Sequence, residues 1–119
     1  MGITNINKQL GLPTDKMKKV VICFDVDGTL RNNNDDSLIA NERIRTLLVI
    51  LSSFKNVKII VWSGSGELYA RQVAQAIGIA SYVDDYASKT AHEEIKTDIA
   101  IDDIQDTAIG KLNLIVKEK

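Results

Sequence analysis

The sequence is short of the residues on which several common scaffolds and sites depend. It has one cysteine, Cys23, so no disulfide can form within the chain, and a single histidine, His92, among 119 residues. His92 has no second histidine beside it and no cysteine pair to join, so a zinc site is not indicated. No apolar run approaches the roughly 20 residues that a membrane-spanning helix needs. These absences argue against a disulfide scaffold, a structural zinc site and a transmembrane anchor.

The net charge of the chain is also close to zero. The net charge is −1, which gives no general attraction to nucleic acid or to an anionic membrane. The apolar fraction of 45% and the charged fraction of 26% are those of an ordinary soluble protein. With one cysteine and no recognisable signal peptide, we expect a cytoplasmic location.

The only proline, Pro13, lies in a polar N-terminal stretch, MGITNINKQLGLPTDK, that shows no sustained periodicity. We predict that residues 1–16 form an added arm, with a short helix as the alternative. Residues 17–119 have the length of one domain.

The rest of the chain alternates between strand and helix patterns. Strands are predicted over residues 18–24, 57–62, 81–83, 97–102 and 111–116, and amphipathic helices over residues 38–54 and 68–77. This alternation predicts an α/β fold, a doubly wound, Rossmann-like sheet of five parallel strands with helices on both faces. The stretch over residues 107–110 is too short for a full helix and is expected to leave part of the sheet uncovered.

Polar residues gather where the predicted strands end. Asp25 and Asp27 follow the first strand in VVICFDVDGTL, Ser63 ends the second, and Asp102 and Asp103 end the fourth. In parallel sheets, ligands bind at the carboxyl ends of the strands. Clustered carboxylates are tolerated when a hard cation neutralises them, and Mg²⁺ prefers such oxygen ligands together with phosphate. The pattern therefore predicts a phosphate site that contains a metal ion.

Two simpler interpretations of DVDG were weighed. An isolated D-x-D-G is often only an exposed turn. An EF-hand calcium loop in this register would place Cys23 and Asn34 at its first and last ligand positions, and a strand precedes it, so that interpretation fails.

DVDGTL, IIVWSG and IAIDD, in this order and with a lysine between the last two, resemble the signatures of the haloacid dehalogenase (HAD) superfamily of phosphotransferases. The resemblance covers residues 18 to about 116. It implies that Asp25 is a nucleophile forming an aspartyl-phosphate and that Asp27 is general acid and then general base. It further implies that Lys89, or Lys96 as the rival, neutralises the nucleophile and the developing charge.

The same resemblance assigns the remaining site. Asp25, the backbone carbonyl of Asp27 and Asp102 would bind Mg²⁺, with Asp103 near the metal or bound through water. Ser63 would donate to the phosphoryl group, and Asp106 would either support the metal site or cap a short turn. Four further residues are expected to border the phosphate or a substrate anion: Gly28, Thr29, Gly64 and Arg31.

The stretches that hold substrate-selecting caps in this superfamily each have room here for about one helix, so a capless member is expected. An open site suits an exposed phosphate on a macromolecule, and equally a small molecule if a second copy of the chain serves as the lid. The function expected is a magnesium-dependent phosphomonoester hydrolase. The alternatives are a nucleotide-binding module, suggested by GSGELYA although Tyr69 stands where that motif needs glycine or alanine, and a non-catalytic interaction module on the same fold.

Overall fold

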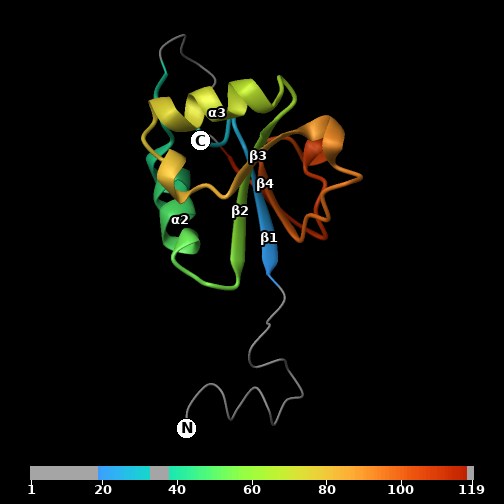
Figure 1. Ribbon diagram of the computed structural model, residues 1–119. Coiled ribbons are helices and arrows are strands. Elements are labelled where there is room, and N and C mark those ends of the chain that lie inside the picture. Colours follow the sequence, from blue (N-terminus) through green and yellow to red (C-terminus); the bar gives the residue numbers. More distant parts are fainter. Residues whose placement is uncertain (1–18, 33–37, 118–119) are drawn as a thin grey trace, which may run out of the picture.

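The computed structural model describes residues 19–32 and 38–117, so the predicted arm over residues 1–16 lies outside the described part of the chain. The described part contains a sheet, two α-helices and three short 3₁₀ turns (Figure 1). None of its helices is long and apolar enough to cross a membrane.

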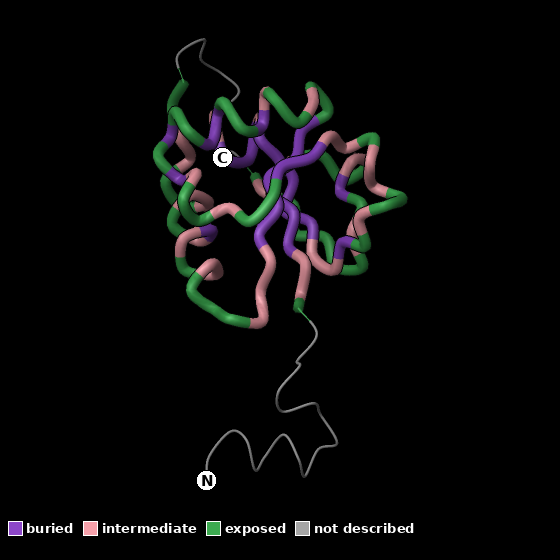
Figure 2. The backbone as a smooth tube through the Cα atoms, viewed as in Figure 1, coloured by how far each residue is buried: buried purple, intermediate pink, exposed green. Residues whose placement is uncertain are grey.

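The sheet has five strands, β1 (Val20–Asp25), β2 (Val57–Ser63), β3 (Asp85–Ser88), β4 (Ile99–Asp102) and β5 (Leu112–Ile115). Their spatial order is β3-β2-β1-β4-β5, and every neighbouring pair is parallel. The prediction of a five-stranded parallel sheet is therefore confirmed. The inner strands form the buried centre of the molecule in Figure 2, which agrees with their nearly continuous apolar sequences.

The third strand begins later than predicted. Most of residues 81–83 belong to the 3₁₀ turn η1 (Ala80–Tyr82), in which the Tyr82 N–H donates to the Ile79 carbonyl at 2.9 Å. The actual β3 begins with the exposed Asp85 and has only two buried residues. An edge strand this short carries no β-branched run, so its sequence lacks the pattern by which the other strands were recognised.

The two α-helices, α2 (Glu42–Ser52) and α3 (Glu67–Ala76), pack on the same face of the sheet (Figure 1). The expectation of helices on both faces therefore needs correction, because the other face carries only short 3₁₀ segments in the described residues. The helix-covered core includes Phe24, Leu48, Val61 and Val73. The other face has a smaller cluster, which consists of Cys23, Ile60, Trp62 and Ala87 with Ile95 packed against it.

The handedness of the connections explains this arrangement. Crossovers between parallel strands are right-handed, so the steps from β1 to β2 and from β2 to β3 place their helices on one face. The return from β3 to β4 and the step to β5 use the other face. Those stretches form only η2 (Lys89–Ala91) and η3 (Gln105–Thr107) with the turns around them.

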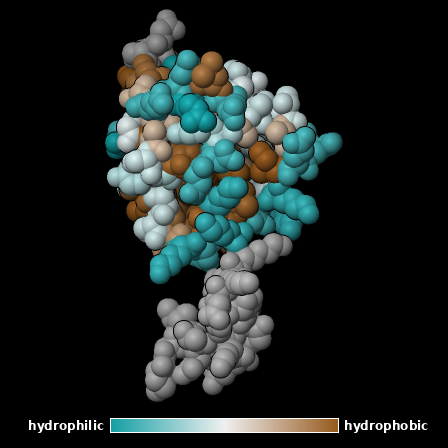
Figure 3. Space-filling model, viewed as in Figure 1, coloured by the Kyte–Doolittle hydropathy of each residue, from teal (hydrophilic) through white to brown (hydrophobic). Residues whose placement is uncertain are grey.

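As the short connection before it predicted, β5 is exposed at all four residues. Leu112 is 52% exposed and Leu114 is 45% exposed. Other exposed apolar side chains include Ile50 on α2 and Leu68 on α3. On the face viewed in Figure 3, apolar areas are set among hydrophilic ones.

The direction in which successive strands are added to the sheet reverses between β1 and β4. These strands are neighbours, with Phe24 opposite Ile101, but their connections leave toward opposite edges of the sheet. Such a switch point leaves a crevice at the carboxyl ends of the two strands, where α/β proteins bind ligands. Asp25 is the last residue of β1 and Asp102 the last of β4, so both predicted carboxylates lie at this crevice.

Packing of α2 on the sheet can be tested with two neighbouring residues of that helix. Leu48 is fully buried, whereas Ile50 is 54% exposed. We expect Leu48→Ala to lower the free energy of unfolding by about 2–5 kcal/mol, the usual cost of such a cavity. Ile50→Ala should cost far less. Urea unfolding of both variants measures the difference, and equal losses would contradict the assigned face of α2.

Candidate functional site

A hollow of about 240 Å³ opens at the carboxyl end of the sheet. The turn after β1, the turn after β2, the beginning of η2 and the segment after β4 all contribute to it. Its lining includes six residues singled out in the sequence, Asp25, Asp27, Ser63, Gly64, Lys89 and Asp103, and three others, Ser65, Ile104 and Thr107. Segments far apart in the chain therefore meet in one place.

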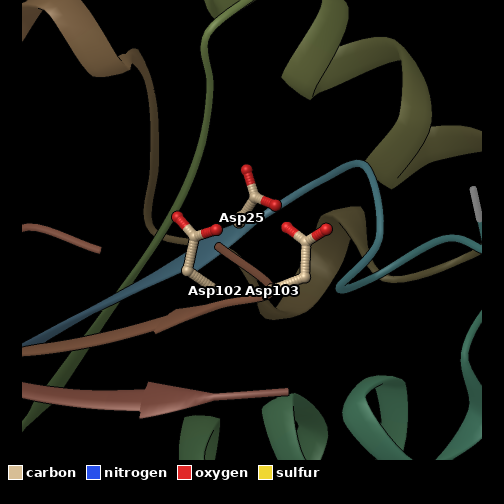
Figure 4. A group of neighbouring side chains, drawn as sticks. All are labelled: Asp25, Asp102 and Asp103. Atoms are coloured by element: carbon tan, nitrogen blue, oxygen red, sulfur yellow. The ribbon is translucent and has the colours of Figure 1, made fainter. Parts of the chain in front are cut away.

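Three carboxylates converge at the floor of this region. Oxygen atoms of Asp25, Asp102 and Asp103 all lie within 4.8 Å of one another. Figure 4 shows the three side chains turned toward a common space from the ends of β1 and β4. Asp25 is 6% exposed and Asp102 is 1% exposed, so water screens the repulsion between their negative charges only weakly.

Lys89 supplies the positive charge for this cluster. Its Nζ lies 2.7 Å from Asp25 Oδ1 and 2.6 Å from Asp102 Oδ2. Lys96, the rival in the sequence, is exposed and makes no ion pair within the described residues. Lys89 opens η2 directly after β3, and Ser88 stabilises that turn by accepting a hydrogen bond from the Thr90 N–H.

Burial and mutual contacts shift the pKa values of Asp25, Asp103 and Lys89 in this cluster. Burial raises the pKa of Asp25 from 3.8 to about 7, although the hydrogen bond from Lys89 acts to lower it. Burial likewise raises the pKa of Asp103. For Lys89, burial acts to lower the pKa, but the hydrogen bonds to Asp102 and Asp25 outweigh it and the net shift is upward. The Lys89 ammonium is therefore well compensated, whereas burial favours the protonated forms of Asp25 and Asp103.

A tight turn follows β1 and positions the next residues. The Arg31 N–H donates to the Val26 carbonyl at 3.0 Å, and Gly28 has a φ of 80°, which favours glycine. Thr29 is fully buried, and its hydroxyl donates to Asp25 Oδ2 at 3.1 Å. Thr29 was expected to border the phosphate, and in the structure its hydroxyl holds the Asp25 carboxylate.

Asp27 is held by a separate network. Its Oδ1 accepts a hydrogen bond from Tyr69 Oη at 2.6 Å and one from Arg31 Nη1 at 2.9 Å. Arg31 was expected to meet a substrate anion. In the structure its guanidinium pairs with Asp27, and this contact raises the pKa of Arg31.

The turn after β2 brings a hydroxyl to the hollow. Ser63 is 3% exposed, and its Oγ accepts a hydrogen bond from the Ser65 N–H at 3.0 Å. Gly64 also lines the hollow, and Gly66, the N-cap residue just before α3, has a φ of 107°. Glycine permits this conformation, which turns the chain from β2 into α3.

Two residues of this region were not recognised as site residues from the sequence. Thr107 Oγ1 lies 3.2 Å from each carboxylate oxygen of Asp102 and accepts from Lys89 Nζ at 3.3 Å. Asp106 had been considered for support of Asp102, but it is exposed in η3 and its neighbour Thr107 makes the contact. In the sequence, Tyr69 stands out only as the residue at which GSGELYA departs from the dinucleotide-binding motif. No motif marks either residue, because their roles depend on how η3 and α3 lie against the site.

Comparisons of the chain with protein-family models, with curated proteins and with solved structures found no match.

The raised pKa of the buried Asp25 predicts a pH dependence of stability in the metal-free protein. Asp25 has a pKa of about 7 in the folded state against an ordinary 3.8, so between these values the folded state binds more protons. The free energy of unfolding should therefore gain a contribution as the pH falls from about 7 toward 4. Asp25→Asn removes this contribution.

Urea unfolding in EDTA at pH 7.5 and pH 5 measures the effect as the difference between wild type and Asp25→Asn. We expect the free energy of unfolding of wild type, relative to that of Asp25→Asn, to be larger at pH 5 than at pH 7.5. A difference that stays constant or changes in the opposite direction would show that Asp25 does not take up a proton on folding.

Proposed function

We propose that this protein is a magnesium-dependent phosphomonoester hydrolase, a capless member of the HAD superfamily. The observation that carries the proposal is the convergence of Asp25, Lys89 and Asp102 at the ends of β1, β3 and β4. A second carboxylate, Asp27, lies two residues beyond Asp25 at the same hollow. These are the groups that phosphoryl transfer through an aspartyl-phosphate requires, namely a nucleophile, charge neutralisation and an acid for the leaving group.

The donor set fits a hard divalent cation. Three carboxylates with oxygen atoms within 4.8 Å of one another face a single ammonium, so the cluster retains an excess of negative charge. Oxygen-only ligands of this kind suit Mg²⁺. Asp25, Asp102 and Asp103 would hold the ion, with the backbone carbonyl of Asp27 as a further ligand. When bound, Mg²⁺ neutralises these carboxylates together with the oxygens of the substrate phosphate.

In the first half of the proposed reaction, a carboxylate oxygen of Asp25 attacks the phosphorus of the ester. The new bond makes an aspartyl-phosphate, and the bond from phosphorus to the leaving oxygen breaks. Protonated Asp27 gives its proton to that oxygen, so the alcohol departs neutral. In the second half, water attacks the aspartyl-phosphate and gives a proton to Asp27. Inorganic phosphate leaves and the Asp25 carboxylate is restored.

Two residues assist these steps from fixed positions. Lys89 Nζ contacts Asp25 directly and offsets negative charge that builds up on the phosphoryl oxygens. Ser63 Oγ accepts from a backbone N–H, which leaves the hydroxyl hydrogen available to a phosphoryl oxygen. Both lie at strand ends or turns of the sheet rather than on long loops, which favours precise placement.

An open site is part of the proposal. Within the described residues, the connections from β1 to β2 and from β2 to β3 each contain one α-helix, α2 and α3. No domain covers the hollow in that part of the chain, so the substrate is either an exposed phosphate on a macromolecule or a small phosphoester. A second copy of the chain acting as a lid would favour the small phosphoester.

Phosphate release from p-nitrophenyl phosphate tests the proposed function. We expect turnover that requires magnesium and stops with EDTA. Asp25→Asn should abolish it, because an amide cannot form the acyl phosphate. Full activity of this variant would exclude Asp25 as the nucleophile, and full activity after removal of metal would exclude the metal requirement. Absence of turnover in wild type would favour the binding or interaction modules.

Magnesium should also stabilise the fold, since its ligands come together only in the folded state. At about 100 times the dissociation constant, a ligand of the folded form adds roughly 2.7 kcal/mol, or roughly 10 °C in Tm for a domain of this size. Asp103→Asn should shrink this shift. Asp106→Asn, which alters an exposed acid three residues further on, should leave it unchanged. Thermal scans with EDTA and with magnesium at matched ionic strength decide the matter, and equal shifts in both variants would remove Asp103 from the metal site.

A further inference from the structure

Asp27 is attached to its surroundings through only one of its two carboxylate oxygens. Oδ1 accepts from Tyr69 Oη at 2.6 Å and from Arg31 Nη1 at 2.9 Å. Arg31 Nη1 also lies 3.4 Å from Tyr69 Oη, so the three polar groups contact one another. Among the described residues, no hydrogen bond reaches Oδ2. The Asp27 side chain is 39% exposed and lines the hollow.

The two donors are held by different parts of the fold. Tyr69 lies in the first turn of α3, and its ring packs against the hydrophobic core that α3 shares with the sheet. Arg31 closes the turn after β1, where its carbonyl accepts from the Gly28 N–H at 2.8 Å. The phenol hydroxyl is therefore placed by α3 and the guanidinium by the β1 turn. Together they restrict rotation of the Asp27 carboxylate.

We infer that Tyr69 is a positioning residue that orients the general acid of the proposed reaction, so that Asp27 transfers its proton through Oδ2. This inference rests on the proposed function and extends it. With Oδ1 occupied by two donors, Oδ2 is the oxygen left to carry the proton to the leaving group and to receive one from water. Fixing a proton donor in a productive orientation contributes to rate because the group need not be ordered during the reaction.

The inference separates Tyr69 from a residue that only packs. Replacing Tyr69 by phenylalanine keeps the ring in the core and deletes only the hydroxyl that contacts Asp27. If the hydroxyl serves Asp27, its loss matters most where protonation of the leaving oxygen matters most. Phenyl phosphate has a poorer leaving group than p-nitrophenyl phosphate and depends more on the acid.

The experiment compares kcat/KM for these two esters, because kcat/KM covers the steps through departure of the leaving group. We expect Tyr69→Phe to lower the value for phenyl phosphate roughly tenfold or more, and the value for p-nitrophenyl phosphate clearly less. Inhibition by inorganic phosphate should be unchanged, since Tyr69 is not among the residues that line the hollow and its hydroxyl donates to Asp27. Tyr82→Phe, which removes the hydroxyl of a tyrosine 42% exposed on η1, is the matched control and should equal wild type.

A double-mutant cycle completes the test. Asp27→Asn should show the same preference for the good leaving group, and adding Tyr69→Phe to it should lower kcat/KM no further, because Tyr69 acts only through Asp27. Equal losses for both esters, or a full additional loss in the Asp27→Asn background, would overturn the role of Tyr69 and leave the proposed function standing. No phosphate release from either ester by wild type would overturn the proposed function and this inference with it.

Discussion

The candidate site depends on one buried ion pair network, in which the Lys89 ammonium lies between Asp25 and Asp102 at 2.7 and 2.6 Å. Removing one partner from a buried pair leaves an uncompensated charge and typically costs about 3–5 kcal/mol. Asp102 is held further by the Ile104 N–H at 3.0 Å and by Thr107. The ends of β1 and β4, the beginning of η2 and the turn η3 are therefore joined through a few polar contacts. Displacing any one of these elements would separate charges that have little access to water.

The same network leaves the site short of positive charge, and this shortage connects stability to the proposed chemistry. Burial raises the pKa of Asp25 to about 7, so below that pH the folded protein without metal keeps a proton on this carboxyl. A protonated carboxyl is a poor nucleophile, so at such pH values the metal-free site would not be prepared for the proposed attack on phosphorus. A divalent cation among Asp25, Asp102 and Asp103 would favour the ionised form and remove their mutual repulsion. The requirement for metal would then arise from folding energetics as well as from the reaction.

The sequence predicted the parts of this molecule that depend on strong local patterns. Buried strands have β-branched runs, and parallel strands bring their ends to one edge, so the meeting of Asp25 with Asp102 followed from strand patterns alone. The choice of Lys89 over Lys96 needed the resemblance, because residues 89–96 have no pattern that shows which of the two lysines turns inward. Thr107 and Tyr69 were missed for a different reason. Tyr69 satisfies the apolar period of α3 with its ring while its hydroxyl reaches Asp27, and a hydropathy pattern registers only the ring.

Asp25 and Asp27 are two residues apart, yet the fold gives them different environments. Asp25 is buried at the end of β1, between an ammonium and the Thr29 hydroxyl. Asp27 lies in the turn that follows β1, where its side chain is 39% exposed and held at a single oxygen. In the proposed reaction these two environments suit two different roles. A nucleophile benefits from exclusion of water and from fixed counter-charges, whereas a group that gives up a proton and takes one back from water must keep one oxygen accessible. Asp27 must be both oriented and accessible. Holding it by Oδ1 alone allows this, because the carboxylate is oriented while Oδ2 stays open to the leaving group and to solvent.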